Sequence, residues 1–191
     1  MKTSINLLLL GMLLVASTSC VDWRERDENG DPIDVLPPKT AIGKKNLGFM
    51  LDDKVWVAEN ATTLGFSMDT YIDDNLVVHV RAIKNVSRSY GDIFQTFEIA
   101  FRPQADSVYI FNVSSPYTFN HQTDSVSVFW YDAAKGCTDN DIPVQVENLD
   151  FTLTHILIDG KIISGEFSMN VLVDGCESFR ITDGRFDVLV Q

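Results

Sequence analysis

The C-terminal part of the chain alternates apolar and polar side chains with a period of two, which restricts it to β-strands. From Ile163 to Val173, apolar side chains occupy one face, and serine, glutamate and asparagine occupy the other. Three dipeptides typical of tight hairpin turns separate the apolar runs: Asp159-Gly160, Asp174-Gly175 and Asp183-Gly184. The pattern predicts a meander of four antiparallel strands between residues 149 and 190. Arg185 and Asp187 share the outer face of the last strand, and we expect them to pair.

Upstream segments carry the same alternation around short acidic turns. Asp52-Asp53 lies between two apolar runs and predicts one hairpin, and Asp73-Asp74-Asn75 predicts a second one. Further strands are expected at residues 93–101, 108–113, 125–130 and 142–146. Because no segment keeps a helical period, the predicted fold class is all-β, an antiparallel β-sandwich or an open barrel of about ten strands.

The N-terminus has the three sectors of a secretory signal. A positive start at Lys2 is followed by an apolar run from Ile5 to Val15 and by small residues up to Cys20. Crossing a bilayer takes roughly 20 apolar residues, so this run is too short for a transmembrane helix. A cysteine directly after small residues resembles the bacterial lipobox, with Ser17 where that motif most often has Leu. The resemblance implies cleavage before Cys20 and acylation of its thiol, and the alternative is an ordinary secretory signal with an incidental cysteine.

The segment after Cys20 is charged, contains three prolines between Val21 and Pro38, and shows no period. This composition predicts a flexible tether. The expected organisation is a signal peptide at 1–19, the lipidated cysteine with an acidic tether at 20–45, and a single β domain at 46–191. Acidic residues soon after Cys20 resemble the export signal of surface lipoproteins in Bacteroidetes. We therefore expect lipid anchoring in the outer membrane, with the domain on the cell surface or on the periplasmic face.

The chain is strongly acidic, with a formal net charge of −12. A protein of this charge is a poor binder of nucleic acid and would be repelled by anionic lipid headgroups. Solubility is the simplest explanation for the acidity. Among partners we therefore expect the membrane, through the lipid, and a glycan or an envelope protein, but no nucleic acid.

Three cysteines occur in the sequence, and lipidation would consume Cys20. Cys137 and Cys176 remain as an even pair in an exported protein, which predicts one disulfide. The alternative is two free thiols in turns, which a reducing host would permit.

Both ends of the predicted β domain carry short motifs, at residues 46–49 and 52–56 and at residues 163–167 and 181–188. These motifs resemble those of small Bacteroidetes lipoproteins of unknown function. Residues 46–56 match an opening of the form N-x-G … G-K-x-W, except that Asp53 stands where that family usually has Gly. Residues 163–167 and 181–188 match a closing G-x-F … I-T-D-G-R-F-D-V. The resemblance covers about residues 46–190 and implies the fold and the location. It implies no catalytic residue, because that family has no agreed activity.

Motifs for catalysis and metal binding are not found in the sequence. It lacks a nucleophile elbow, a phosphate-binding loop, a dinucleotide fingerprint and any zinc or HExxH spacing. Of the three histidines, we expect His79 to be exposed, His121 to lie in a loop and His155 to lie on the apolar face of its strand. We therefore expect no cofactor, no metal and no enzymatic activity.

Two further features bear on surface chemistry. Ser107 and Ser125 each stand between aspartate and valine, which resembles the O-glycosylation acceptor known in Bacteroidetes, although a chance tripeptide explains the match equally well. Aromatic side chains can stack on sugar rings. Trp56 and Trp130 sit at alternating strand positions and are expected in the core, so Tyr117, in a loop, is the best exposed candidate.

Taken together, the sequence favours a membrane-anchored, non-enzymatic binding module of the cell envelope. A structural or assembly component of a surface complex is the second hypothesis. A hydrolase with a carboxylate pair is the third, although the sequence shows no constellation that would carry it.

Overall fold

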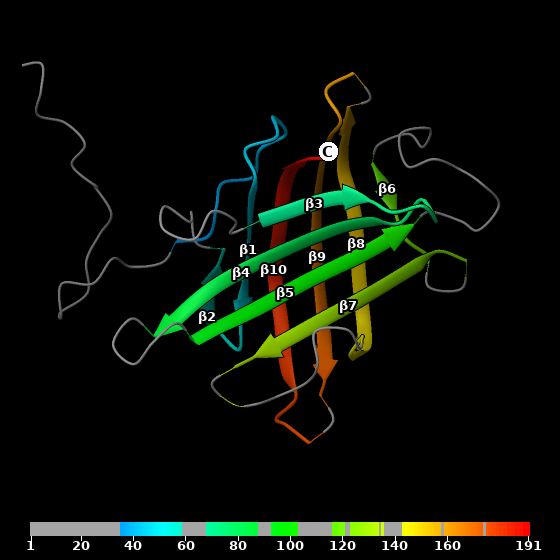
Figure 1. Ribbon diagram of the computed structural model, residues 1–191. Helices are drawn as coiled ribbons and strands as arrows, with labels where there is room; N and C mark the ends of the chain where they lie inside the picture. Colours follow the sequence, from blue (N-terminus) through cyan, green and yellow to red (C-terminus); the bar gives the residue numbers. More distant parts are fainter. Residues whose placement is uncertain are drawn as a thin grey trace, which may run out of the picture. The chain divides into compact units, whose positions relative to one another are not determined.

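The computed structural model describes residues 35–58, 68–87, 93–102, 116–120, 123–133, 135, 143–157, 159–173 and 175–191. These residues belong to one compact unit, Asp34–Gln191. Within them the chain forms ten strands and no helix, arranged as two antiparallel sheets (Figure 1). The all-β fold class and the sandwich of two sheets are therefore confirmed.

The larger sheet has six strands in the order β2-β1-β10-β9-β8-β6. Its strands are β1 (Asn46–Leu51), β2 (Lys54–Val57), β6 (Tyr117–Thr118), β8 (Gln145–Leu157), β9 (Ile162–Leu172) and β10 (Phe179–Leu189). The N-terminal hairpin thus pairs with the last strand of the chain. The predicted turn at Asp52-Asp53 is confirmed, and both residues have positive φ, of 44° and 65°.

The smaller sheet has four strands in the order β3-β4-β5-β7. They are β3 (Met68–Ile72), β4 (Val78–Ser87), β5 (Ile93–Arg102) and β7 (Ser125–Asp132). This sheet lies in front of the six-stranded sheet in Figure 1, and its strands run across those behind. The predicted strand at 108–113 lies outside the described residues.

Aromatic rings fill the space between the two sheets. Phe97 of β5 stacks on Phe167 of β9 with ring centroids 5.6 Å apart, and Phe49 of β1 stacks on Trp56 at 4.7 Å. Phe49 also touches Phe97 at 4.8 Å, so rings from both sheets form one continuous cluster. Offset or tilted aromatic pairs of this kind each contribute roughly 0.5–1.5 kcal/mol beyond their buried area.

The predicted turn at Asp183-Gly184 is wrong. β10 continues through these residues, and its pairing with β9 shifts register between Ile181 and Gly184. Asp183 has φ of 52°, so the dipeptide forms a β-bulge inside a strand and not a hairpin. The C-terminal meander therefore has three strands, β8, β9 and β10, where the sequence predicted four.

Gly165 of β9 and Gly184 of β10 lack side chains and so leave room for two phenylalanine rings. A Cβ atom on Gly184 would lie 2.5 Å from the ring of Phe167, and a Cβ on Gly165 would lie 2.6 Å from the ring of Phe186. The register pairs Gly184 with Phe167 and Gly165 with Phe186. Each ring thus covers the glycine of the neighbouring strand, which explains why the closing motif repeats the pattern Gly-x-Phe.

A second irregularity changes the C-terminal half of β8. The pairing with β9 shifts between Leu153 and His155, so one extra residue is inserted in β8. After the shift, Ile156 packs against the core, and Leu157 is 42 % exposed. The prediction that His155 lies on the apolar face of its strand is therefore wrong.

The sequence suggested that Asp187 pairs with Arg185. In the structure, Asp187 instead fixes the segment before β1. Its carboxylate is 1 % exposed and accepts hydrogen bonds from five donors. These are the hydroxyls of Thr40 and Ser164 and the backbone N–H groups of Ile42, Gly43 and Lys44, at 2.6–3.2 Å. Residues 35–45, which the sequence assigns to the tether, are thus held at their C-terminal end against β9 and β10.

Candidate functional site

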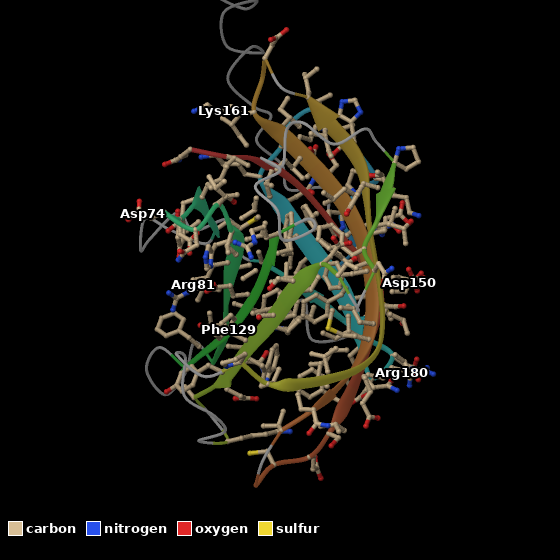
Figure 2. The ribbon with its side chains drawn as sticks, turned by 90° about the vertical axis from the view of Figure 1, so that its right-hand side faces the viewer. Asp74, Arg81, Phe129, Asp150, Lys161 and Arg180 are labelled. Carbon is tan, nitrogen blue, oxygen red and sulfur yellow. The ribbon has the colours of Figure 1, made fainter. Side chains whose placement is uncertain are left out.

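The outer face of the four-stranded sheet carries a group of aromatic and charged side chains. The cross-strand register places Tyr71 beside His79, Arg81 beside Glu98, and Glu98 beside Phe129. In Figure 2, Arg81 and Phe129 project from the side of this sheet that is turned away from the six-stranded sheet. We call this group the outer-face cluster; its members are Tyr71, His79, Arg81, Glu98, Phe129 and Tyr131.

Tyr71 and His79 form the aromatic corner of the cluster. Their rings are stacked, with centroids 4.6 Å apart and an interplanar angle of 4°. Tyr71 is 39 % exposed, and β3 is an edge strand of its sheet. The ring face of Tyr71 that points away from His79 therefore looks out beyond the sheet edge. Phe129 and Tyr131 are half-buried on β7, at the opposite edge.

Glu98 forms the polar centre of the cluster. It is 9 % exposed, although it lies on the outer face, because it belongs to the central strand β5 and has large neighbours on both sides. One carboxylate oxygen lies 2.8 Å from His79 Nδ1, and the other lies 3.9 Å from Arg81 Nε. The first contact is a hydrogen bond. The second is an ion pair, because its distance is too long for a hydrogen bond.

Two buried nitrogens of the cluster have no hydrogen-bond partner among the described residues. They are His79 Nε2 and Arg81 Nε. The nearest acidic group to His79 Nε2 is Asp73, at 3.6 Å, which is an electrostatic contact only. Buried polar atoms are normally hydrogen-bonded. The cluster therefore retains hydrogen-bonding capacity that the described protein groups do not use.

Asp73 connects the cluster to the turn between β3 and β4. Its carboxylate accepts hydrogen bonds from the backbone N–H groups of Asn75 and Val77, both at 2.9 Å. Burial alone would raise the pKa of Asp73, but these hydrogen bonds outweigh it and hold the pKa below its ordinary value. The negative charge beside His79 is therefore kept at neutral pH, and the prediction of an aspartate turn here is confirmed.

The phenol of Tyr71 stays protonated at neutral pH. Burial raises its pKa, and the nearby carboxylates of Glu98 and Asp69 raise it further. The hydroxyl can therefore both donate and accept a hydrogen bond at the rim of the cluster.

The outer-face cluster combines the two features that carbohydrate recognition needs. Exposed aromatic faces can stack on the C–H face of a sugar ring, and a guanidinium beside a carboxylate can bond to vicinal hydroxyls.

A small hollow lies at one end of the sandwich and measures about 100 Å³. Trp130, Asp132 and Cys176 are among the residues that line it. Asp132 accepts a hydrogen bond from Gln95, which in turn accepts one from the indole of Trp56. Ligand pockets usually measure roughly 300–1,000 Å³, so this hollow is too small for a sugar ring, and we assign the network to the core.

The structure changes which aromatic side chains are candidates for stacking on a sugar ring. Trp56 and Trp130 are 2 % and 4 % exposed, which confirms that they belong to the core. Tyr117 is not an exposed platform, because its ring packs edge-on against Phe119 and its hydroxyl donates to Asp124 at 2.9 Å. The expectation that His79 is simply exposed is also wrong, since it lies between two carboxylates.

The covalent sites are tested only in part. Cys176 is disulfide-bonded, and Cys137 lies outside the described residues, so its pairing with Cys176 stays a prediction. Ser125 is exposed at the first position of β7, where a glycan could be accommodated. Ser107 and Cys20 lie outside the described residues, as does His121.

Comparison with protein-family models, with curated proteins and with solved structures gives no match for this chain. The resemblance to Bacteroidetes lipoproteins therefore stays a prediction. Within the described residues, no group of three or more His, Cys, Asp or Glu side chains is arranged to hold a metal ion. No helix in the same part of the chain is long and apolar enough to cross a bilayer.

Proposed function

We propose that this protein is a lipid-anchored lipoprotein of the bacterial envelope whose β-sandwich binds carbohydrate and catalyses no reaction. The observation that carries the binding role is the outer-face cluster. Tyr71 offers a free ring face at one sheet edge, Phe129 and Tyr131 lie at the other, and Arg81 and Glu98 stand between them. The anchor is supported by the leader and by Cys20 directly after it.

The binding role is tested with the mature chain, residues 20–191, carrying Cys20→Ser so that no lipid is attached. The chain is applied to an array of bacterial, plant and host oligosaccharides. We expect retention on a defined subset of glycans, and weaker retention of the Arg81→Gln variant. Retention on no glycan, together with a stoichiometric protein partner after crosslinking in cells, would favour the structural or assembly role instead.

The anchor is tested separately in a bacterial host. Cells are grown with an alkyne-bearing fatty acid, and the protein is isolated and probed for the label. We expect the wild-type protein to be labelled and the Cys20→Ser variant to be unlabelled. A labelled Cys20→Ser protein, or an unlabelled wild type, would contradict the anchor without affecting the binding role.

The location follows from the same proposal. We place the protein in the outer membrane, with the domain on the cell surface or on the periplasmic face. Protease treatment of intact cells separates the two faces, because only a surface domain is digested while a periplasmic control protein survives.

A further inference from the structure

Exposed apolar side chains gather at one end of the sandwich, away from the outer-face cluster. Three of the exposed large hydrophobic residues in the described part of the chain lie there: Ile42, Leu157 and Leu189, which are 65 %, 42 % and 38 % exposed. They come from the loop before β1, the end of β8 and the end of β10. Large apolar side chains grouped on a surface mark an interaction site more often than isolated ones do.

The register shows that these side chains are neighbours. Leu157 pairs with Ile162 of β9, and Ile162 pairs with Leu189 of β10, so the three form one row across three strands. The loop before β1 lies against this row, because a Cβ on Gly43 would be 3.1 Å from Ile162 Cγ1 and 3.7 Å from Leu189 Cβ. We call Ile42, Leu157, Ile162 and Leu189 the apolar end patch.

The patch is held in place by hydrogen bonds. The backbone N–H groups of Ile42, Gly43 and Lys44 all donate to the buried carboxylate of Asp187. The backbone N–H of Val190 donates to the carbonyl of Lys161 at 2.9 Å, which joins the end of β10 to the β8–β9 hairpin. The exposure of Ile42 therefore belongs to a fixed loop.

Exposed lysines lie around the patch, although the whole chain is acidic. Lys44, Lys45 and Lys161 are exposed beside it, and Figure 2 shows Lys161 at this end of the sheet. The negative groups at the same end include Asp159, on the hairpin, the C-terminal carboxylate of Gln191 and the buried carboxylate of Asp187. The charges of this end thus roughly cancel, but lysines outnumber Asp159 among the exposed side chains named here, in a chain whose net charge is −12.

We propose that the apolar end patch rests on the phospholipid bilayer, with its three lysines facing anionic headgroups. Apolar side chains inside a basic rim are the combination that binds a membrane interface. The proposal rests on the proposed lipid anchor in one respect, which is reach. Residues 21–34 separate Cys20 from the described domain, and 14 extended residues span at most about 50 Å. A tether of this length keeps the patch at high effective concentration near the bilayer.

The orientation that follows bears on the binding role. The patch lies on the six-stranded sheet and its end loops, whereas the outer-face cluster lies on the opposite sheet. A domain that rests on the bilayer through the patch keeps Tyr71 and Arg81 facing away from the membrane contact.

The test uses the mature chain with a hexahistidine tag in place of Cys20, attached to vesicles that contain nickel-chelating lipid. The vesicles are phosphatidylethanolamine and phosphatidylglycerol, so the experiment requires neither acylation in cells nor a glycan. Surface lysines are acetylated briefly, and the modification of each lysine is measured by mass spectrometry. The same chain at the same concentration without vesicles is the reference, and the exposed Lys54 on β2 is the internal control.

We expect Lys44, Lys45 and Lys161 to react about threefold more slowly on the vesicles, with Lys54 unchanged, because a bilayer contact excludes the reagent. The variant Ile42→Ser with Leu157→Ser, at two exposed positions, is expected to restore the reactivity of the three lysines. Equal reactivity with and without vesicles would overturn the proposal. Slow acetylation of the three lysines that is already present without vesicles would indicate contact between copies of the chain. This result would overturn the proposal as well.

Discussion

At the scale of single residues, the buried carboxylate of Asp187 holds the segment before β1 against β9 and β10. Burial by itself would raise the pKa of Asp187, but hydrogen bonds from the Thr40 hydroxyl and from the N–H groups of residues 42–44 hold the pKa below its ordinary value. A carboxyl group whose folded pKa is lowered stabilises the fold above its unfolded pKa of about 3.9. That stability is lost as the pH falls through the folded pKa.

Asp187→Asn is therefore expected to destabilise the domain at pH 7 by about 1–3 kcal/mol, because buried donors lose their charged acceptor. The variant is also expected to lose less stability than wild type between pH 5 and about pH 2, since the group that titrates is gone. Urea unfolding followed by tryptophan fluorescence at several pH values measures both effects. Asp150→Asn, at an exposed position on β8, is the matched control. Identical pH profiles for wild type and Asp187→Asn would contradict this account of Asp187.

At the scale of elements, two positions in β9 and β10 accept only glycine, because each lies under a phenylalanine ring of the neighbouring strand. Gly184→Ala or Gly165→Ala places a methyl group 2.5–2.6 Å from a core phenylalanine ring, and neither ring can move without disturbing the aromatic cluster. Overpacking of this kind costs about 1–3 kcal/mol. Thermal unfolding is expected to show the loss for both variants.

Gly160→Ala provides the comparison for these two substitutions. Its Cβ would meet only the ends of the Ile162 and Leu157 side chains, at 3.2 Å, and these can shift into solvent. We expect a change below about 1 kcal/mol for this variant. If Gly160→Ala lost as much stability as Gly184→Ala, the ring contacts would not explain why glycine is required at positions 165 and 184.

Alternation was sufficient to predict most of these elements, because burying one face of a strand requires it. It predicted the hairpin at Asp52-Asp53, the turn at Asp73-Asp74-Asn75, and the core positions of Trp56 and Trp130. It failed where a bulge inserts one residue, as at Asp183 and before His155, because a bulge changes the face without changing the composition. An Asp-Gly dipeptide satisfies a bulge and a turn equally well, since both need positive φ.

The outer-face cluster could not be predicted from the sequence, for a related reason. His79 and Glu98 lie 19 residues apart and meet only through the pairing of β4 with β5. The sequence indicated that His79 points outward, but it does not give the strand register that brings Glu98 within hydrogen-bond distance of it. The sequence pattern that could point to such a cluster is a pair of charged or aromatic residues at outward positions of neighbouring strands. This pattern is too common to identify a site.

At the scale of the whole molecule, the two sheets have separate roles in our account. The six-stranded sheet holds the segment before β1 through Asp187 and carries the apolar end patch. The four-stranded sheet supports the outer-face cluster, and its backbone is fixed from behind by the aromatic core. The motif that resembles known lipoproteins lies mainly in β9 and β10 and serves packing, so it carries no information about the ligand.

The central claim is that carbohydrate binds to the outer face of the four-stranded sheet. The most direct test is a calorimetric titration of a glycan retained by the wild-type protein into three variants: Tyr71→Ala, Phe129→Ala and Asp150→Ala. Figure 2 shows Phe129 and Asp150 on opposite sides of the sandwich. We predict that the first two variants bind about tenfold more weakly, as for the loss of a central aromatic contact, and that Asp150→Ala binds as wild type. Unchanged affinity in both aromatic variants would contradict the claim.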